Sequence, residues 1–391
     1  MKPFKIENVE VGKKHVFIIA EAGVNHEGSI PMAKKLIDAA KDSGSDMVKF
    51  QTFSADKIII KSTKMADYQQ KNLGSKQTQY ELLKSLEITE KDHVDLKKYC
   101  EKKGIIFQST AHCNKWSLDL LEKLGVSSHK IASGDLINIP LIKLVAETQK
   151  PFIISSGMGN MDEVKEAIDT IRKTGNDKFV FLHCTTNYPT PFDQVNLAVM
   201  DTISKKFDCY AGYSDHTEGL FVPMLAVFNG AKVIEKHYTL SRSIKNPKSP
   251  DHVASLEPDE LKKMVAGIRN IESNNYKTFK DAVAGLKKIG IDLTPEFKEK
   301  GLDATIKLVM GNGIKQPTAA EKTIAPRIRK SIMCIRPIKK GEKFTDKNID
   351  ILRPEGGLHP REWDKLISNG VASKDIKPED PITADKVSYK K

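Results

Sequence analysis

Residues 15–28, HVFIIAEAGVNHEG, run from a short apolar stretch straight into a dense group of polar side chains and two glycines. Residues 16–19 are β-branched or aromatic, which is typical of a strand buried on both faces of a parallel sheet. Glu21, Asn25 and His26 follow at once. Because functional groups in parallel α/β folds gather where the strands end, we expect this junction to form one wall of a site.

Seven more apolar runs follow, separated by segments with helical periodicity. The eight runs are HVFIIAEAG (15–23), MVKFQTF (47–53), GIIFQSTA (104–111), SSHKIASGD (127–135), PFIISSG (151–157), KFVFLHC (178–184), CYAGYSD (209–215) and AKVIEKHYTL (231–240). In the first helical segment Ser29 can cap, Pro31 suits the first turn and Gly44 ends the helix. Eight strand–helix units predict a (β/α)8 TIM barrel, an α/β fold. The alternative, a doubly wound open sheet, would favour a GxGxxG-type turn, and GVNHEG lacks that spacing.

The pattern changes after Asn274, so we divide the chain into a barrel at 1–274, a helical insert or linker at 275–325 and a small domain at 326–391. Lysine-rich helical stretches fill the second part. The third part contains an internal repeat, because aligning Ile338 with Ile376 places Phe344 on Ile382 and Ile349 on Val387. This repeat predicts a small β-rich module with approximate twofold symmetry.

Composition narrows the function classes. The 391 residues carry a net charge of +12, yet no block of lysine and arginine with interleaved aromatic residues is present, so we expect no nucleic-acid partner. No apolar run reaches the ~18 residues of a membrane span, and no leader is evident, so we expect a soluble, cytoplasmic protein without a membrane partner. The five scattered cysteines favour buried thiols over disulfides or a thiolate zinc site.

Strand alternation pairs several residues at the strand ends. Ser214 and His216 share one face of the seventh run, and Glu235 and His237 share one face of the eighth. Neighbouring strands lie ~4.8 Å apart, so the two imidazoles can converge on one divalent metal ion. The alternative is a pair of histidines with unrelated internal hydrogen bonds.

Lys49 and Lys130 lie on apolar runs, where an ammonium group is costly to bury unless it meets an anion. Hydroxyl groups at Ser109, Thr110, Ser133, Ser155 and Ser214 accompany them at the strand ends. Two lysines among hydroxyls favour a cradle for a phosphate and a carboxylate. Two alternatives stay open: a Schiff-base lysine, or a lysine that reaches the surface while the serines cap turns.

The ordered motifs FIIAEAGVNHEG, VKFQTF, KIASGD, ISSGM, HCTTNYPTP, GYSDHT, EKHYTL and SPDHVASLEP closely resemble the sialic acid synthase family, over residues 15 to about 273 and again 326–389. The resemblance implies condensation of phosphoenolpyruvate with an N-acetylated amino sugar and water, giving a nonulosonate and phosphate. It also implies a TIM barrel followed by an antifreeze-like (SAF) domain, in a domain-swapped homodimer.

The resemblance also assigns residues. His216 and His237 match the family's metal ligands, which bind Mn²⁺ or Mg²⁺, and with Glu21 they form the expected catalytic group. Glu21 and Asp251 match residues that contact the sugar, and Arg353 matches an arginine that reaches the sugar's N-acetyl group across the dimer. The residues expected to bind the phosphoenolpyruvate donor are Lys49, Thr110, Lys130, Ser133, Ser155, Ser214 and, near a position where some members have asparagine, Thr186 and Asn187.

N-acetylmannosamine is the first candidate acceptor, and a diacetamido-trideoxy hexose leading to legionaminic or pseudaminic acid is the alternative. A barrel enzyme for a phosphorylated aldose would need more arginines than Arg172, Arg242 and Arg269, the only ones in residues 1–274. A non-catalytic carbohydrate-binding protein would be expected to have lost Glu21, Lys49 or a paired histidine. The individual roles of Asn25 and His26 stay open, and the alternative to a role in the site is that they only hold the first loop in shape.

Overall fold

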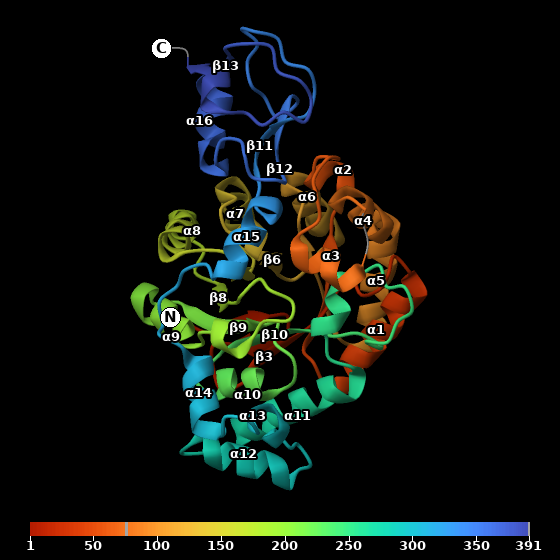
Figure 1. The fold of residues 1–391 in the computed structure, drawn as a ribbon, viewed down its shortest axis with the longest axis vertical. Coiled ribbons are helices and arrows are strands. Elements are labelled where there is room, and N and C mark those ends of the chain that lie inside the picture. Colours follow the sequence, from red (N-terminus) through yellow and green to blue (C-terminus); the bar gives the residue numbers. More distant parts are fainter. Residues whose placement is uncertain (75–76, 390–391) are drawn as a thin grey trace.

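Eight parallel strands form one sheet at the centre of the molecule (Figure 1). The computed structural model describes residues 1–74 and 77–389, so the last two residues of the predicted 326–391 domain lie outside the described part. The strands are β3 Phe17–Gly23, β4 Met47–Thr52, β5 Ile106–Ala111, β6 His129–Ile131, β7 Phe152–Ser155, β8 Phe179–His183, β9 Tyr210–Asp215 and β10 Val233–His237. Each lies within one of the eight predicted runs.

The sheet curves into a barrel. The last strand, β10, pairs in parallel with the first, β3, and Val233 stands opposite Phe17. At the remaining seam β5 lies against β6, and the Gln108 side-chain amide donates to the carbonyl oxygen of Ser128 at 2.7 Å. The (β/α)8 prediction is therefore confirmed, and the open-sheet alternative is wrong.

Helices surround the barrel, most of them with one buried face. They are α1 Ile30–Ser43, α5 Glu90–Lys103, α6 Asn114–Leu124, α7 Ile139–Glu147, α8 Met161–Lys173, α9 Ala198–Phe207, α10 Phe221–Phe228 and α11 Pro258–Ser273. In α1 the Ser29 hydroxyl accepts from the Met32 amide, and Gly44 ends the helix with φ +84°, a conformation that favours glycine. The start and stop signals predicted for this helix are confirmed.

A short antiparallel hairpin that the sequence analysis did not anticipate covers the amino ends of the strands. It consists of β1 Phe4–Ile6 and β2 Val9–Val11. Its side chains Phe4, Ile6 and Val11 join one apolar cluster with Phe17 of β3 and Tyr210 of β9. This packing closes the amino end of the barrel, and the polar strand ends lie on the opposite side.

Between β4 and β5 the chain forms three additional helices, α2 Ala55–Ile58, α3 Asp67–Leu73 and α4 Gln79–Leu86. Their apolar residues pack with Val24 of the first loop and with Phe53. This segment therefore lies over the carboxyl ends of the strands, next to the junction at residues 20–28.

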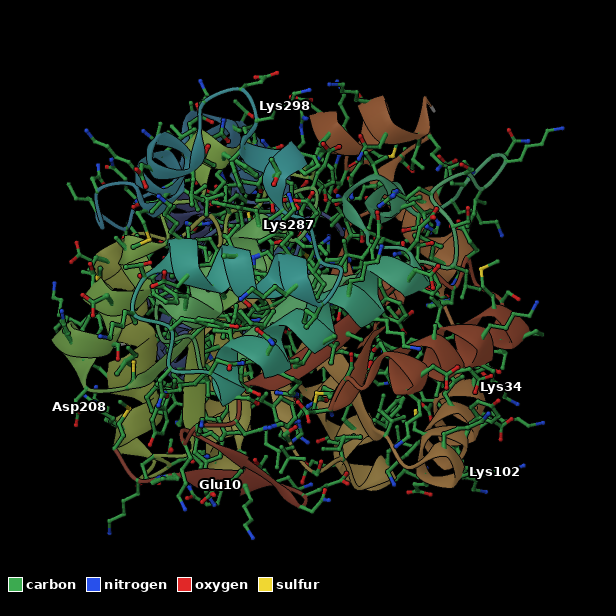
Figure 2. All side chains as sticks on the ribbon, turned by 90° about the horizontal axis from the view of Figure 1, so that it is seen from below. Glu10, Lys34, Lys102, Asp208, Lys287 and Lys298 are labelled. Carbon is green, nitrogen blue, oxygen red and sulfur yellow. The ribbon has the colours of Figure 1, made fainter. Side chains whose placement is uncertain are left out.

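The insert is helical, and its first part packs onto barrel helices of its own chain. It contains α12 Phe279–Lys288, α13 Thr294–Phe297, α14 Leu302–Met310 and α15 Ala319–Ile328. The Phe279 ring meets the Phe221 ring of α10 edge-on at 5.5 Å, and the Glu296 carboxylate accepts from the Leu220 and Phe221 amides. Helices α12 and α13 lie at the end opposite the small domain, the face seen in Figure 2 with Lys287 and Lys298.

The small domain is built from two related halves. Strand β11 Ser331–Cys334 pairs with β12 Ile349–Leu352, and β13 Gly370–Ala372, which follows α16 Trp363–Asn369, pairs with β14 Val387–Tyr389. The aligned residues Ile338 and Ile376 exchange backbone hydrogen bonds of 3.0 and 2.8 Å. Strands β12 and β14 begin at the aligned positions 349 and 387, as the predicted repeat requires.

All five cysteines are buried and unpaired, as expected for structural thiols. Within the described residues, no helix combines the length and apolar character that crossing a membrane requires.

Candidate active site

A pocket opens at the carboxyl ends of the barrel strands, and the residues that the family resemblance assigned to the site line it, except Asn187. Ser109 of the predicted hydroxyl cradle does not line it either, and instead accepts from the Thr52 hydroxyl at 2.7 Å. The lining includes Glu21, Lys49, Thr110, Lys130, Ser133, Ser155, Thr186, Ser214, His216, His237, Asp251 and Arg353. These residues come from seven strands, from the loops that follow them and from the small domain. The side-chain amide of Asn187 instead donates to Gln194 at 3.4 Å, so only Thr186 of that pair lines the pocket.

Two lysines and two glutamates form a buried charge cluster at the floor of the pocket. The Lys49 ammonium lies 2.6 Å from Glu21 Oε2 and 3.6 Å from Glu235 Oε2. The Lys130 ammonium lies 3.7 Å from Glu235 Oε1. Glu21 and Lys49 are direct register partners on β3 and β4, so the pairing of the two strands brings these charges together.

Hydroxyl groups complete this cluster. Lys49 donates to Thr110 Oγ1 at 3.1 Å, Lys130 to Ser155 Oγ at 2.5 Å, and Ser214 to Glu235 Oε1 at 2.9 Å. Both lysines are buried, with 4% and 2% of their surface exposed, so the alternative that one of them reaches the surface is wrong. Converging ammonium and hydroxyl donors form a cradle suited to an anion.

The two glutamates have opposite pKa shifts. Burial raises the pKa of Glu21 to about 7, with the charge of Glu235 adding to the effect and Lys49 opposing it. Burial also acts to raise the pKa of Glu235, but the ammonium groups of Lys130 and Lys49 lower it to about 2. Two nearby carboxylates with separated pKa values are typical of acid–base sites, and Glu21 is the one suited to proton transfer near neutral pH.

The two predicted metal ligands lie next to each other, with ring centres 5.5 Å apart. His216 Nδ1 donates to the Thr185 carbonyl at 2.7 Å, which leaves its Nε2 as a ligand atom. His237 Nδ1 is buried without a hydrogen-bond partner among the described residues, 4.0 Å from Asp251 Oδ2. Burial lowers the pKa of both histidines, so both are neutral, as metal ligands must be.

This donor set fits a divalent ion held by two imidazoles, with its remaining positions open. Across residues 1–74 and 77–389, no group of three or more histidine, cysteine or acidic side chains forms a closed metal cage. Water and substrate oxygens would therefore complete the coordination, as in catalytic rather than structural sites.

Two tyrosines that the sequence analysis did not single out cover the histidines. The Tyr188 ring lies 4.1 Å from the His216 ring and stacks on Tyr68 of α3 at 5.2 Å. Asn72, also in α3, donates to the carbonyl oxygens of Tyr188 and Pro250. Helix α3 thus ties together two loops at the mouth of the pocket. Tyr188 lies in the motif NYPTP, which could have indicated it as a site residue.

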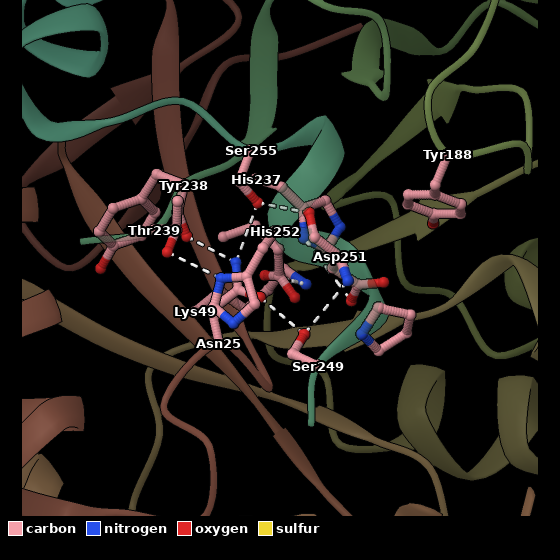
Figure 3. Close-up of polar contacts among 12 residues, drawn as sticks. Asn25, Lys49, Tyr188, His237, Tyr238, Thr239, Ser249, Asp251, His252 and Ser255 are labelled. Atoms are coloured by element: carbon pink, nitrogen blue, oxygen red, sulfur yellow. Dashed lines mark hydrogen bonds and ion pairs between the residues drawn. The ribbon is translucent and has the colours of Figure 1, made fainter. Parts of the chain in front are cut away.

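Asn25 holds the loop that carries Asp251 (Figure 3). Its amide nitrogen donates to the Tyr238 carbonyl at 2.8 Å and to Ser255 Oγ at 2.9 Å, and its oxygen accepts from Ser249. The Asp251 amide in turn donates to Ser249 Oγ at 3.2 Å. The side chain of Asn25 therefore ties the first loop to the eighth, the loop that carries Asp251.

Arg353 enters the pocket from the small domain. Its amide donates to the Ile58 carbonyl at 2.9 Å, and its carbonyl accepts from the Ile60 amide at 3.1 Å. Its Nε is buried and has no hydrogen-bond partner in the described part of the chain, so the guanidinium is available to a ligand. Within one chain Arg353 thus lines the chain's own pocket, and its exchange between two subunits stays a prediction.

Comparisons with known proteins agree with this arrangement. Residues 36–279 match the model of the NeuB family, and residues 329–388 match the model of the SAF domain. The chain belongs to the NeuB family. Its barrel and its small C-terminal domain are thus the two modules on which the resemblance to the sialic acid synthases was based.

Relatives within the NeuB family span nearly the full chain. N,N'-diacetyllegionaminic acid synthase of Legionella pneumophila is 41% identical over 90% of this chain and 89% of its own. N-acetylneuraminate-9-phosphate synthase of Drosophila melanogaster is 30% identical over 95% of this chain and 96% of its own. The crystal structure of spore coat polysaccharide biosynthesis protein SpsE of Bacillus subtilis superimposes with a TM-score of 0.78, at 36% identity over 100% of both chains.

Proposed function

We propose that this chain condenses phosphoenolpyruvate with an N-acetylated amino sugar and water to give a sialic-acid-type nonulosonate and phosphate. The observation that carries the proposal is the buried cluster of Lys49 and Lys130 among hydroxyl donors, beside a carboxylate whose pKa is raised to about 7. The cluster can hold an anionic donor, and the carboxylate can move a proton. Relatives named as nonulosonate synthases support the reaction class.

The donor's charges would be met by the two ammonium groups. Lys49 and Lys130 stand on β4 and β6, and Thr110 on β5 lies between them in the barrel. The hydroxyl of Thr186 is buried and has no partner among the described residues, so it can donate to the same ligand. Bound in this way, the phosphate and carboxylate of phosphoenolpyruvate are fixed before the acceptor arrives.

The reaction forms one carbon–carbon bond and breaks one carbon–oxygen bond. The methylene carbon of phosphoenolpyruvate attacks the aldehyde carbon of the open-chain sugar, and water adds to the neighbouring enol carbon. That carbon then releases inorganic phosphate and becomes the keto group of the product. Glu21 takes the proton from the attacking water, because its pKa near 7 leaves a basic carboxylate at neutral pH.

His216 and His237 would hold the divalent ion, Mn²⁺ or Mg²⁺, that the family resemblance implies. The unpartnered Nδ1 of His237 and the free Nε2 of His216 are the ligand atoms this assignment uses. A divalent ion bound there supplies Lewis-acid polarisation of the acceptor aldehyde. Asp251 lies 4.0 Å from His237 and can orient the sugar hydroxyls beside that aldehyde.

For the acceptor we favour a diacetamido-trideoxy hexose over N-acetylmannosamine. The N,N'-diacetyllegionaminic acid synthase of Legionella pneumophila is 41% identical to this chain, against 30% for the N-acetylneuraminic acid synthetase of Leptospira borgpetersenii. Leu82, Leu83 and Leu86 of α4 give one wall of the pocket an apolar character. A methyl group in place of a hydroxyl gains from such a wall, whereas a hydroxyl there loses its hydration.

A phosphorylated acceptor fits less well, because the barrel arginines are engaged elsewhere. Arg242 pairs with Glu260, Arg269 pairs with Asp46 and Glu272, and Arg172 donates to the Phe207 carbonyl. Among the residues described as lining the pocket, Arg353 is the only arginine.

The experiment that tests the proposed function measures phosphate release from phosphoenolpyruvate with each acceptor. We expect release with the diacetamido-trideoxy hexose, slower release with N-acetylmannosamine, and none without an acceptor. A folded protein that binds these sugars but releases no phosphate would support the non-catalytic alternative instead.

A further inference from the structure

The linker that precedes the small domain reaches into the back of the pocket. Glu321 of α15 is 1% exposed, and its Oε1 accepts from the Met158 amide at 2.7 Å and from the Thr186 amide at 2.8 Å. Met158 lies in the loop after β7 and Thr186 in the loop after β8. One carboxylate oxygen therefore connects two neighbouring loops of the site.

Arg329, at the end of the same helix, holds Met158 from the other side. Its Nη2 donates to the Met158 carbonyl, and its guanidinium pairs with both carboxylate oxygens of Glu163 at 2.8 Å. Met158 has φ +60°, in the left-handed region that a non-glycine residue keeps only where surrounding contacts enforce it. Glu321 and Arg329 supply such contacts to both sides of this residue.

The position of Met158 matters because the preceding backbone is packed tightly against the pocket hydroxyls. The Gly157 amide donates to Ser133 Oγ at 3.1 Å. A Cβ atom at Gly157 would lie 2.2 Å from Thr186 Oγ1 and 2.7 Å from Ser133 Oγ, so only glycine allows this approach. Movement of Met158 would therefore displace Ser155, Ser133 and Thr186 relative to one another.

The charge of Glu321 acts on a buried lysine of the linker. Lys315 is 4% exposed, and burial lowers the pKa of its ammonium group while the Glu321 carboxylate opposes that shift. A buried carboxylate with a cationic neighbour and three backbone donors, from Met158, Thr186 and Thr318, is held in place rather than mobile.

We propose that Glu321 and Arg329 are positioning residues for the donor, so that the linker helix α15 is a functional part of the phosphoenolpyruvate site. Neither is placed against a reacting atom: both act through Met158 on the donor-binding residue Ser155, and Glu321 also holds the backbone amide of Thr186 directly. The inference rests on the proposed function, because it takes phosphoenolpyruvate as the ligand of those two residues. The first strand of the small domain, β11, begins two residues after Arg329, so the docking of this domain and the shape of the donor site are coupled.

The test compares Glu321→Ala with a matched control, Glu296→Ala. Glu296 is likewise a glutamate of the insert that accepts from two barrel amides, those of Leu220 and Phe221, and it does not line the pocket. We expect Glu321→Ala to raise KM for phosphoenolpyruvate about tenfold, the effect of losing charge-assisted hydrogen bonds, with little change in KM for the sugar. Glu296→Ala should lower Tm and leave both KM values unchanged.

Two further variants keep the test decisive if Glu321→Ala does not fold. Glu321→Gln retains one carbonyl oxygen for the two amides and should recover part of the KM loss. Arg329→Lys loses the paired contact with Glu163 and should raise KM for phosphoenolpyruvate alone. Unchanged KM values in both variants, with a wild-type chain that binds phosphoenolpyruvate in calorimetry, would overturn this inference alone. Failure of the wild-type chain to bind phosphoenolpyruvate would overturn the proposed function and this inference with it.

Discussion

The ammonium group of Lys49 lies 2.6 Å from the carboxylate of Glu21, and the two residues stand opposite each other on β4 and β3. In the proposed reaction this pair would link donor binding to proton transfer. A donor phosphate or carboxylate that pairs with Lys49 would share its ammonium group with Glu21, so one lysine would hold both the donor and the proposed base.

The first prediction concerns pH and Glu21. Because the pKa of Glu21 is raised to about 7, its carboxylate becomes protonated as the pH falls through that value, and a protonated carboxyl cannot act as the base. We therefore expect kcat/KM to fall below about pH 7. Glu21→Gln should lower kcat by about 10²–10⁴-fold and abolish this limb of the profile. Phosphate release between pH 5 and 9 measures both effects.

The control for this experiment is Glu10→Gln, which changes a glutamate of the β1–β2 hairpin at the amino end of the barrel. It should leave both the rate and the pH profile unchanged. Persistence of the acidic limb in Glu21→Gln would show that another group titrates, and our assignment of the base would then be wrong.

The second prediction concerns the metal. We expect dialysis against EDTA to abolish turnover and Mn²⁺ to restore it, and we expect His237→Ala to remove Mn²⁺ binding measured directly by calorimetry. The Nδ1 of His237 has no hydrogen-bond partner in the described residues, so its loss should change Tm little. His15→Ala, which alters a partly exposed histidine paired with Asp46, serves as the control. Full turnover in excess chelator would refute the assignment.

The third prediction concerns exchange of the small domain between subunits. In an exchanged dimer, Lys49→Ala and Arg353→Ala subunits are each inactive, but a mixed dimer has one complete pocket. When the two variants are mixed in equal amounts, about half of the dimers contain one subunit of each kind, and each such dimer has one complete pocket out of two. Activity should therefore recover to about a quarter of wild type. No recovery despite proven subunit mixing would mean that Arg353 serves the pocket of its own chain, where it lies in the structure.

The fourth prediction concerns the junction between the domains. Lys330, fully buried, donates to Asp135 Oδ1 at 2.7 Å. Lys330→Met leaves the Asp135 carboxylate buried without its partner, so we expect a loss of about 3–5 kcal/mol in the free energy of unfolding at pH 7. Urea unfolding measures this loss. Lys339→Met, which breaks an exposed pair with Asp375, should cost at most about 1 kcal/mol.

The loss should also depend on pH. Burial acts to raise the pKa of Asp135, but Lys330 lowers it below its usual value of 3.8. A lowered pKa stabilises the folded chain above the unfolded pKa and ceases to do so as the pH falls through the folded one. In folded Lys330→Met, burial without the ammonium group leaves the pKa of Asp135 higher than in wild type, so the variant binds a proton there at a higher pH. The difference in the free energy of unfolding between wild type and Lys330→Met should therefore shrink as the pH falls; a constant difference would contradict this explanation.

Much of the fold could be predicted from sequence because each barrel strand is buried on both faces and appears as an apolar run. The β1–β2 hairpin could not be predicted, because strands of three residues such as Phe4–Ile6 are too short for a recognisable alternation of apolar and polar side chains. Helices α2 to α4 were missed for a related reason. They are short, and they owe their place to packing against the first loop rather than to strong periodicity of their own.

Much of the site could also be predicted, because strand alternation and motif resemblance both mark strand ends. Glu235 was recognised as facing the same way as His237, but its contacts with two lysines depend on the closure of the barrel. Tyr68 lines the pocket from α3, and Glu321 holds two of its loops from α15; neither could be assigned, because the positions of these helices follow from tertiary packing. Asn187 does not line the pocket, because the loop turns its side-chain amide to Gln194.

The central claim is acceptor-dependent cleavage of phosphoenolpyruvate at its carbon–oxygen bond. The most direct measurement uses phosphoenolpyruvate labelled with ¹⁸O at the bridging oxygen, together with the diacetamido-trideoxy hexose and Mn²⁺, followed by mass analysis of the phosphate. We predict that phosphate forms one-for-one with a nonulosonate and carries the label. Unlabelled phosphate, or release that does not require the sugar, would contradict the account.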